Sequence, residues 1–323
     1  MPKAAATSAP TATTSATAKT ASAASGSSAA APHPSPPTAG SEATQATPKS
    51  HELVAPSSWQ QIDFISDLHL QESEPANFLA WRRYLETSTA DAIFILGDLF
   101  ELWVGDDLVQ METESHARTQ QEGLSFESRC RRALHFCAQR MPLYFIHGNR
   151  DFLVGKSFAQ SSGMRLLPDP TVLVFGGQRT LLSHGDALCL ADTDYQTFRA
   201  QVRSPAWQQA FLAKPLPERL RIAQDLRQQS EARKQQDHAQ GKVWIDVDTH
   251  EAIRWMNAST AQDLVHGHTH EGASHPITTA QGTGQRHVLA DWHAEAKPPR
   301  AQVLRMQRGD GGARVHVQRL PLS

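Results

Sequence analysis

Short clusters of Asp, Asn and His side chains recur along the chain, and most of them follow an apolar run. The clusters read SDLHL at 66–70, GDLFELWVGDD at 97–107, HGNRDF at 147–152, SHGD at 183–186 and HGHTH at 266–270. Four of the five come directly after a predicted strand. Because ligands bind at the carboxyl ends of strands in open α/β sheets, these loops can converge on one site.

The residue types in these clusters are those of a hard or borderline metal site. Carboxylate, amide and imidazole ligands without a thiolate favour divalent ions such as Mn²⁺, Fe²⁺ or Zn²⁺. A carboxylate that bridges two such ions roughly 3.5–4 Å apart would let the pair clamp a phosphoryl group during in-line displacement. Together, the clusters predict a two-metal phosphoesterase site.

Taken alone, each cluster also has an ordinary structural explanation. Asp98, which follows a glycine, could be a helix N-cap. Asn149 and Arg150 could shape a turn, and His184 could be a core histidine. The combination of clusters is therefore more specific than any single one.

The three histidines of HGHTH are harder to explain structurally. Alternation along the end of a strand would place His266, His268 and His270 on one face. Such a cluster is costly unless a metal ion or a phosphate lies against it.

Strands that alternate with helices from about residue 59 onward must position these loops. The predicted strands are compact apolar runs at 61–66, 92–96, 143–147, 171–175, 179–184, 263–267, 286–291 and 301–306. The stretches 75–87 and 124–140 are predicted helices that connect strands, as in a sheet covered on both faces. We expect an α/β fold with a layered β-sheet core flanked by helices.

The ends of the domain and one long insertion differ from this pattern. Residues 1–50 contain no Leu, Ile, Val, Phe, Trp or Tyr, so we expect a disordered tail over 1–57 and a folded domain over 58–320. Residues 192–258 show no strand signal and are predicted to form a helical cap, with a long helix at about 216–240.

Composition limits the partners and the compartment. The chain has 31 basic and 33 acidic residues, a formal net charge of −2, and no global basic field, so no nucleic-acid partner is expected. Three cysteines without a CxxC pair suit a reducing compartment, and no apolar run has membrane-spanning length. The cytoplasm is the expected location.

The order D-x-H, GD, GN, H and GHxH over about residues 61–295 resembles the calcineurin-like metallophosphoesterase superfamily. Within it, DLFELWVGDD, HGNRDFLVG, HGDALCLAD-x-DYQTFR and VLADWH are similar to the UDP-2,3-diacylglucosamine pyrophosphohydrolases of lipid A synthesis. The resemblance implies a metallophosphoesterase fold that hydrolyses this nucleotide sugar to UMP and 2,3-diacylglucosamine 1-phosphate, with attack at the phosphorus nearer uridine. Glu271 and Gly272 stand where the family usually has Arg-Pro, which bears on a local phosphate or substrate contact.

The resemblance also implies two divalent metal ions, with Mn²⁺ expected, and a role for individual residues. The implied metal ligands are Asp67 and His69 for the first ion, Asp98 as the bridge, Asn149 and His184 for the second, and His268 and His270 divided between the two. The implied catalytic residues are Asp98, Asn149, Arg150 and His268. The expected substrate contacts are Asn149, Arg150, Asp192, Tyr195, Ser230 and His268. His266 lies just outside the GHxH pattern, and Asp106 and Asp107 are expected to organise their loop.

Arg150 bears on the type of phosphoester. Many members of the superfamily have His after GN, and that His can protonate an alkoxide leaving group. Cleavage of a phosphoanhydride expels a phosphate monoester with a second pKa of about 6, which needs no proton at neutral pH. A fixed guanidinium suits that reaction better, and it argues against protein phosphatases and nucleases. Alternatively, Arg150 packs against Asp151.

Three functional alternatives follow from these residues. The first is the lipid-linked pyrophosphohydrolase; the second is a soluble nucleotide-sugar or dinucleotide pyrophosphatase with the same metals; the third is a metal-binding scaffold without turnover. A diacylated substrate needs an apolar groove near the metals, because water rejects each methylene by roughly 0.8 kcal/mol.

The predicted cap is the strand-free segment large enough to supply that groove. Its apolar side chains are Trp207, Phe211, Leu212, Leu216, Leu220 and Leu226, interleaved with Lys214, Arg219, Arg221 and Arg227. We therefore expect a cap that binds acyl chains and docks on the cytoplasmic face of the inner membrane, which would make the protein peripheral. The alternative is an amphipathic helix whose apolar stripe is core. No protein partner is predicted.

Overall fold

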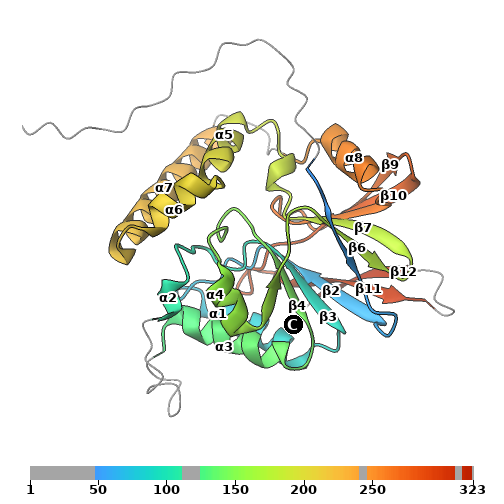
Figure 1. Cartoon of the computed structure of the whole chain (residues 1–323), viewed down its shortest axis with the longest axis horizontal. Coiled ribbons are helices and arrows are strands. Elements are labelled where there is room, and N and C mark those ends of the chain that lie inside the picture. The colour runs from blue at the N-terminus through green and yellow to red at the C-terminus, as the bar shows by residue number, and fades with distance from the viewer. Residues whose placement is uncertain (1–47, 111–123, 240–245, 310–314, 322–323) are drawn as a thin grey trace, which may run out of the picture. The chain divides into compact units, whose positions relative to one another are not determined.

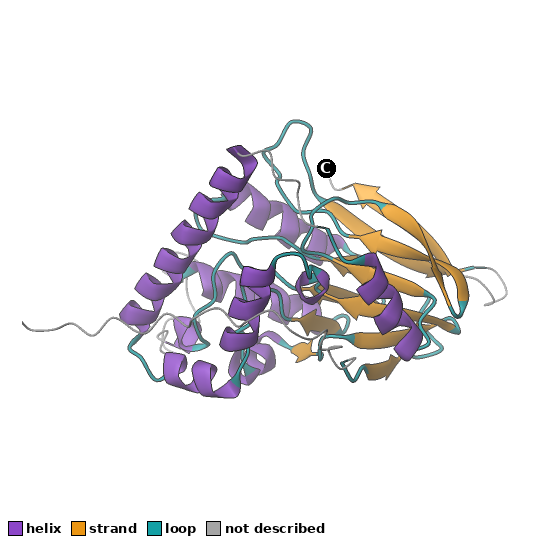
Figure 2. Ribbon diagram, turned by 90° about the horizontal axis from the view of Figure 1, so that it is seen from above, coloured by secondary structure: helices purple, strands orange, loops and turns teal. Residues whose placement is uncertain are grey.

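The computed structural model describes residues 48–110, 124–239, 246–309 and 315–321. Within these ranges, two mixed six-stranded sheets pack face to face, and helices cover their outer faces (Figure 1). Figure 2 shows the strands gathered on one side of the molecule and most of the helices on the other. The predicted α/β fold, with a layered sheet core flanked by helices, is confirmed.

The first sheet contains the strands that precede the Asp and Asn clusters. Its order is β12 (Val315–Pro321), β11 (Gln302–Arg308), β2 (Gln61–Ile65), β3 (Ala92–Leu96), β4 (Leu143–Ile146) and β5 (Met164–Leu166). Strands β2 to β5 are parallel, and the connecting helices are α1 (Pro75–Thr87), α3 (Phe126–Ala138) and α4 (Lys156–Ser162), with the short α2 (Asp107–Gln110) before α3. The loops after β2, β3 and β4 therefore leave the sheet at the same edge.

The second sheet contains the strands that precede the His clusters. Its order is β1 (His51–Val54), β6 (Thr171–Phe175), β7 (Gln178–Ser183), β8 (Asp263–His266), β10 (Gly282–Val288) and β9 (Ser274–Thr279). Strands β7 and β8 are parallel, so the segments after them also emerge at one edge. Helix α8 (Thr249–Ala258) packs on the outer face of this sheet.

Alternating side chains in the strands divide the core into layers. In β3, Phe94 lies in the cluster between the two sheets, whereas Ile93 and Ile95 pack under the helices of the first sheet. In β7, Leu182 faces the first sheet and Leu181 packs with α8. The sheet that contains β2 to β5 is therefore covered on both faces, by helices on one side and by the second sheet on the other.

The helical insertion contains α5 (Thr193–Val202), α6 (Pro205–Leu212) and α7 (Leu216–Ala239), as the sequence predicts. Its expected end at residue 258 is wrong, because α8 packs against β8 and β9 of the second sheet. The cap therefore comprises α5 to α7. Ion pairs join Lys214 to Glu218 and Arg221 to Asp225 along α7.

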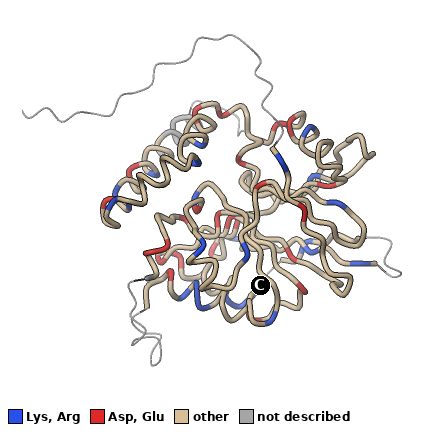
Figure 3. The backbone as a smooth tube through the Cα atoms, viewed as in Figure 1, with Lys and Arg blue, Asp and Glu red and all other residues tan. Residues whose placement is uncertain are grey.

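Acidic and basic residues are interspersed over the other described elements as well (Figure 3). Among the described residues, no helix combines the length and the apolar character needed to cross a bilayer.

The N-terminal boundary differs from the expected one. Strand β1 pairs in parallel with β6, starting with His51 opposite Thr171, and the Ala55 N–H donates to the Val174 carbonyl at 2.9 Å. Ala55 and Trp59 are buried. The expectation that the tail extends to residue 57 is thus wrong for this segment; a four-residue edge strand is too short to show a period. Residues 1–47 lie outside the described residues.

Candidate metal centre

The predicted clusters meet where strands of the two sheets end. Asp67, Asp98 and Asn149 follow β2, β3 and β4, while His184 and His268 follow β7 and β8. Among the described residues, six non-glycine residues have a positive φ, and five of these belong to the predicted site. They are Asp67 at 54°, His69 at 48°, Asp98 at 52°, His268 at 68° and His270 at 63°. Left-handed backbone costs energy for such residues and typically persists where function requires it.

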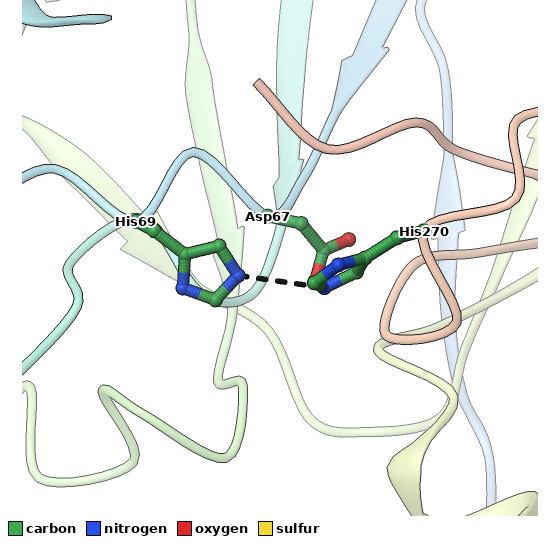
Figure 4. A group of neighbouring side chains, drawn as sticks. All are labelled: Asp67, His69 and His270. Carbon is green, nitrogen blue, oxygen red and sulfur yellow. Dashed lines mark hydrogen bonds and ion pairs between the residues drawn. The ribbon is translucent and has the colours of Figure 1, made fainter. Parts of the chain in front are cut away.

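One group of ligand atoms is formed by Asp67, His69 and His270, whose donor atoms lie within 4.8 Å of one another (Figure 4). The His270 Nε2 atom is 3.3 Å from Asp67 Oδ1 and 3.4 Å from His69 Nε2. Asp67 is fully buried. Two imidazole nitrogens and a carboxylate oxygen converging in this way form a site for a divalent ion.

A second group is formed by Asp67, Asp98 and His184. The Asp98 Oδ2 atom lies 3.8 Å from His184 Nε2 and 4.0 Å from His69 Nε2, so this carboxylate stands between the two groups. Asn149 Oδ1 is 2.9 Å from both His184 Nε2 and His268 Nδ1. All seven residues predicted as metal ligands are therefore brought to one place.

The hydrogen bonds of two histidines test whether these residues fit metal ions. His184 Nδ1 donates to the Leu96 carbonyl at 2.9 Å, and His69 Nδ1 lies 2.8 Å from Glu101 Oε2. In the neutral rings, each Nε2 then presents a lone pair to the site, where Asn149 Oδ1 faces that of His184. An outer acceptor beside Nδ1 is the usual arrangement of a metal-binding His. The donor set fits divalent ions.

The electrostatics of the site also favour a cation. Burial alone would lower the pKa of His184, but the Asp98 and Asp67 carboxylates raise it to about 9. Burial would raise the pKa of Asp67, yet hydrogen bonding and charge from His270 hold it well below its usual range. Burial lowers the pKa of His268 to about 3, which leaves this ring neutral and able to coordinate.

Glycine is required where the loops touch. A Cβ on Gly148 would collide with the Asp98 carboxylate and its backbone N–H. The close approach lets the Arg150 N–H donate to Asp98 Oδ1 at 2.8 Å. The GD and GN motifs therefore pack directly against each other.

The Arg150 side chain lies near Glu101 and not against Asp151, the partner that the sequence suggested. Its Nη1 lies 3.6 Å from Glu101 Oε1. Asp151 is buried and instead accepts backbone N–H groups of both loops, from Leu99 at 2.7 Å and Gly148 at 2.9 Å. The alternative in which Arg150 packs against Asp151 is therefore wrong.

His266 is separated from the other two histidines of HGHTH. Its Nδ1 donates to the Gly267 carbonyl at 2.8 Å, and its Nε2 faces Arg286 Nη1 at 3.4 Å. The strand ends at His266 and the chain then turns, with positive φ at His268 and His270. The expectation that all three share one face is wrong, because strand alternation stops at the first of them.

The expected substrate contacts on the cap occupy different environments. The Tyr195 ring stacks on His268, with centroids 5.9 Å apart, and its hydroxyl donates to Asp186 Oδ2 at 2.5 Å. Asp192 caps α5 by accepting from the Tyr195 N–H at 3.1 Å. Ser230 is exposed on α7. Of these three, Tyr195 touches a residue of the metal centre.

Three buried carboxylates that support the site escaped the sequence prediction. Glu101 contacts His69, Asp151 ties two ligand loops together, and Asp186 holds Tyr195. Each lies inside a motif that stands out in the sequence because of its other residues. Burial alone distinguishes these three from ordinary loop carboxylates, and burial is decided by the tertiary structure.

The calcineurin-like phosphoesterase family matches residues 61–272 of the chain. A UDP-2,3-diacylglucosamine hydrolase from Xanthomonas campestris pv. campestris is 43% identical over 239 residues, which cover 72% of this chain and 91% of that protein. A hydrolase of the same name from Yersinia enterocolitica is 40% identical over 238 residues, covering 72% of this chain and 91% of its own. Among solved structures, Vacuolar Protein Sorting 29 from Cryptosporidium parvum aligns with 82% of this chain and 98% of its own at 13% identity, and its TM-score of 0.36 is too low to inform on function.

Proposed function

The chain belongs to the calcineurin-like phosphoesterase family, and from this premise we propose that it hydrolyses the pyrophosphate bond of UDP-2,3-diacylglucosamine. The products are UMP and 2,3-diacylglucosamine 1-phosphate, an intermediate of lipid A biosynthesis. Support for this substrate comes from relatives named UDP-2,3-diacylglucosamine hydrolase, which are 40% and 43% identical and 91% covered. The protein is thus a metal-dependent hydrolase.

The observation that carries the proposal is the position of Asp98 between the two groups of ligand atoms, with Arg150 attached to it. Asp98 Oδ2 faces one histidine of each group, and its Oδ1 accepts the backbone N–H of Arg150. A bridging carboxylate, together with the Arg150 guanidinium 3.6 Å from Glu101 on the same loop, suits a diphosphate, since one part binds the reacting phosphoryl group and the other the leaving phosphate.

The metal ligands divide as follows. Asp67 and His69 would hold the first ion, Asp98 would lie between the two ions, Asn149 and His184 would hold the second, and His268 and His270 would be divided between them. When bound, two divalent ions, which we assign as Mn²⁺, neutralise phosphate oxygens and make a water molecule more acidic.

The chain's own groups then act on the substrate. Asn149 and His268 orient the phosphoryl group next to uridine, where the water attacks. Arg150 stabilises the charge on the departing sugar phosphate, which leaves without a proton because its second pKa is about 6. Asp192, Tyr195 and Ser230 are assigned to the substrate on the cap side.

The cap is the element that we assign to the acyl chains. Phe211 and Trp207 stack with centroids 4.8 Å apart, and Phe211 is buried, whereas Leu212 remains 43% exposed. Part of the apolar stripe is thus core, as the alternative interpretation has it, and part is available to a lipid. We place the protein at the cytoplasmic face of the inner membrane as a peripheral protein, because its substrate is a lipid.

One assay tests the proposal. Purified enzyme with Mn²⁺ is given either UDP-2,3-diacylglucosamine or UDP-glucose, and release of UMP is measured. We expect rapid turnover of the diacylated substrate and little of UDP-glucose. Equal turnover would favour a soluble nucleotide-sugar pyrophosphatase, and turnover of neither would favour a scaffold.

A further inference from the structure

Glu101 is a buried carboxylate at the centre of the contacts between the metal loops and the cap. It is 7% exposed, and its backbone N–H donates to the Leu70 carbonyl at 3.2 Å, which fixes it beside the loop that carries His69. Its Oε2 lies 2.8 Å from His69 Nδ1. Its Oε1 lies 3.2 Å from Arg227 Nε and 3.6 Å from Arg150 Nη1. The two oxygens therefore face two different groups.

Arg227 belongs to α7, so one of these contacts connects the cap to the metal centre. A second connection lies eight residues earlier on the same helix, roughly 12 Å along its axis. There, Arg219 donates to the Val104 carbonyl at 2.6 Å and to Asp107 Oδ1 at 2.9 Å, and a Cβ on Gly105 would occupy the place of its guanidinium. Both connections end on the loop that begins at Asp98. The cap helix is thus attached at two points to a loop of the metal centre.

We propose that Glu101 is a positioning residue that joins the metal centre to the cap: it orients His69 through one carboxylate oxygen and holds Arg150 and Arg227 through the other. This inference rests on the proposed function, because it gives the two arginines a place beside the diphosphate. It assigns to Glu101 no contact with the substrate.

The chemistry of a carboxylate explains why no amide can replace it. Both carboxylate oxygens of Glu101 lie near nitrogen atoms, those of an imidazole on one side and of guanidinium groups on the other, and a carboxylate can accept on both oxygens. A glutamine has one acceptor and one donor end. If its NH₂ faced His69, the ring would keep its proton on Nε2, the atom that must bind metal. If its NH₂ faced the arginines, both would lose an acceptor.

The test compares four variants with the wild-type protein. Glu101→Gln and Glu101→Asp probe the carboxylate, Arg227→Met removes the cap contact, and the double variant Glu101→Gln/Arg227→Met tests coupling. Arg82→Met is the matched control, since it removes an arginine from a surface ion pair with Glu86 on α1. Affinity for Mn²⁺ alone is measured by calorimetry, kcat and KM with UDP-2,3-diacylglucosamine, and folding by thermal melting.

We expect Glu101→Gln to weaken Mn²⁺ binding about 10- to 100-fold, the usual effect of losing an outer partner of a metal-binding histidine, and to raise KM. Glu101→Asp should recover part of the metal affinity. Arg227→Met should raise KM several-fold with Mn²⁺ affinity unchanged, and the double variant should show no further rise in KM over Glu101→Gln, because both changes break one contact.

Two results would overturn the proposal: wild-type Mn²⁺ affinity in a folded Glu101→Gln or Glu101→Asp protein, or KM effects of Glu101→Gln and Arg227→Met that multiply. The second result would mean that Arg227 acts on the substrate independently of Glu101. If Glu101→Gln does not fold, Glu101→Asp takes its place in both comparisons. The Mn²⁺ titration needs no substrate, so an incorrect substrate assignment would leave the metal comparison standing and remove only the KM comparison.

Discussion

Asp98 shows how much one side chain contributes at this site. Its Oδ1 accepts the Arg150 N–H, its Oδ2 faces His69 and His184, and its own N–H lies 3.3 Å from Asp151 Oδ1. The buried Asp151 carboxylate nearby already accepts the backbone N–H groups of Leu99 and Gly148.

We therefore predict that Asp98→Ala abolishes turnover and lowers the metal content. Loss of the bridging charge leaves Asp67 to serve the ligand groups of both His69 and His184, so the second ion should bind most weakly. Bound Mn²⁺ per protein, measured by elemental analysis beside activity, checks this. Near-normal metal content together with more than about a tenth of wild-type activity would show that Asp98 does not bridge.

Arg150→His tests the argument about the leaving group. We expect pyrophosphatase activity to fall by about 10- to 1,000-fold, in the range seen when a group that stabilises developing charge is removed. Any gain in monoesterase activity should be small, because a proton donor is of no use to a phosphate leaving group. Kinetics with the lipid substrate and with a nitrophenyl phosphate measure both. Unchanged kinetics with the lipid would contradict a role for Arg150 in charge stabilisation.

At the scale of elements, helix α6 presents two neighbouring apolar residues in different environments. Phe211 belongs to the core cluster beneath the helices, while Leu212 is largely exposed. Substitutions at these two positions can therefore distinguish a role in the core from a role in substrate binding, although both residues are simply apolar in the sequence.

We predict that Leu212→Ser raises KM for the diacylated substrate and weakens liposome binding, with little change in melting temperature. Phe211→Ser should instead reduce the free energy of unfolding by about 3 kcal/mol or more, because it empties a core position. Metal content should stay normal in Leu212→Ser. Normal KM and normal liposome binding in that variant would contradict the acyl-binding assignment of the cap.

At the scale of the whole molecule, the N-terminal boundary of the folded domain lies before β1. This edge strand adds four backbone pairs to β6 and leads into Ala55 and Trp59, which are buried. Leu53 packs against the cluster between the two sheets. The domain therefore depends on residues that the composition alone assigned to the tail.

Two truncations distinguish these boundaries. Deletion of residues 1–47 should leave activity and melting temperature almost unchanged. Deletion of residues 1–55 should cost about 2 kcal/mol, the value of burying an aliphatic side chain, and lower Tm by roughly 4–8 °C. Equal melting temperatures for the two truncated proteins would show that β1 contributes nothing to stability.

The sequence by itself determined the elements and the chemistry of this protein. Eight of the strands were visible as apolar runs, and the ligand clusters could be found because each chemical motif is a short contiguous string at the end of a strand. The edge strands β1, β5, β9 and β12 were missed because they are short or partly exposed, so none of them is a compact apolar run.

Only the tertiary structure decided how those pieces meet. Apolar periodicity indicates that one face of a strand is buried, but it does not indicate whether a helix or another sheet buries that face. The packing of the two sheets was therefore not predictable. The separation of His266 from His268 depends on where β8 ends. The role of Glu101 depends on contacts with Arg150, Arg227 and His69, all of them distant in sequence, because a carboxylate becomes a positioning group only when burial and partners surround it.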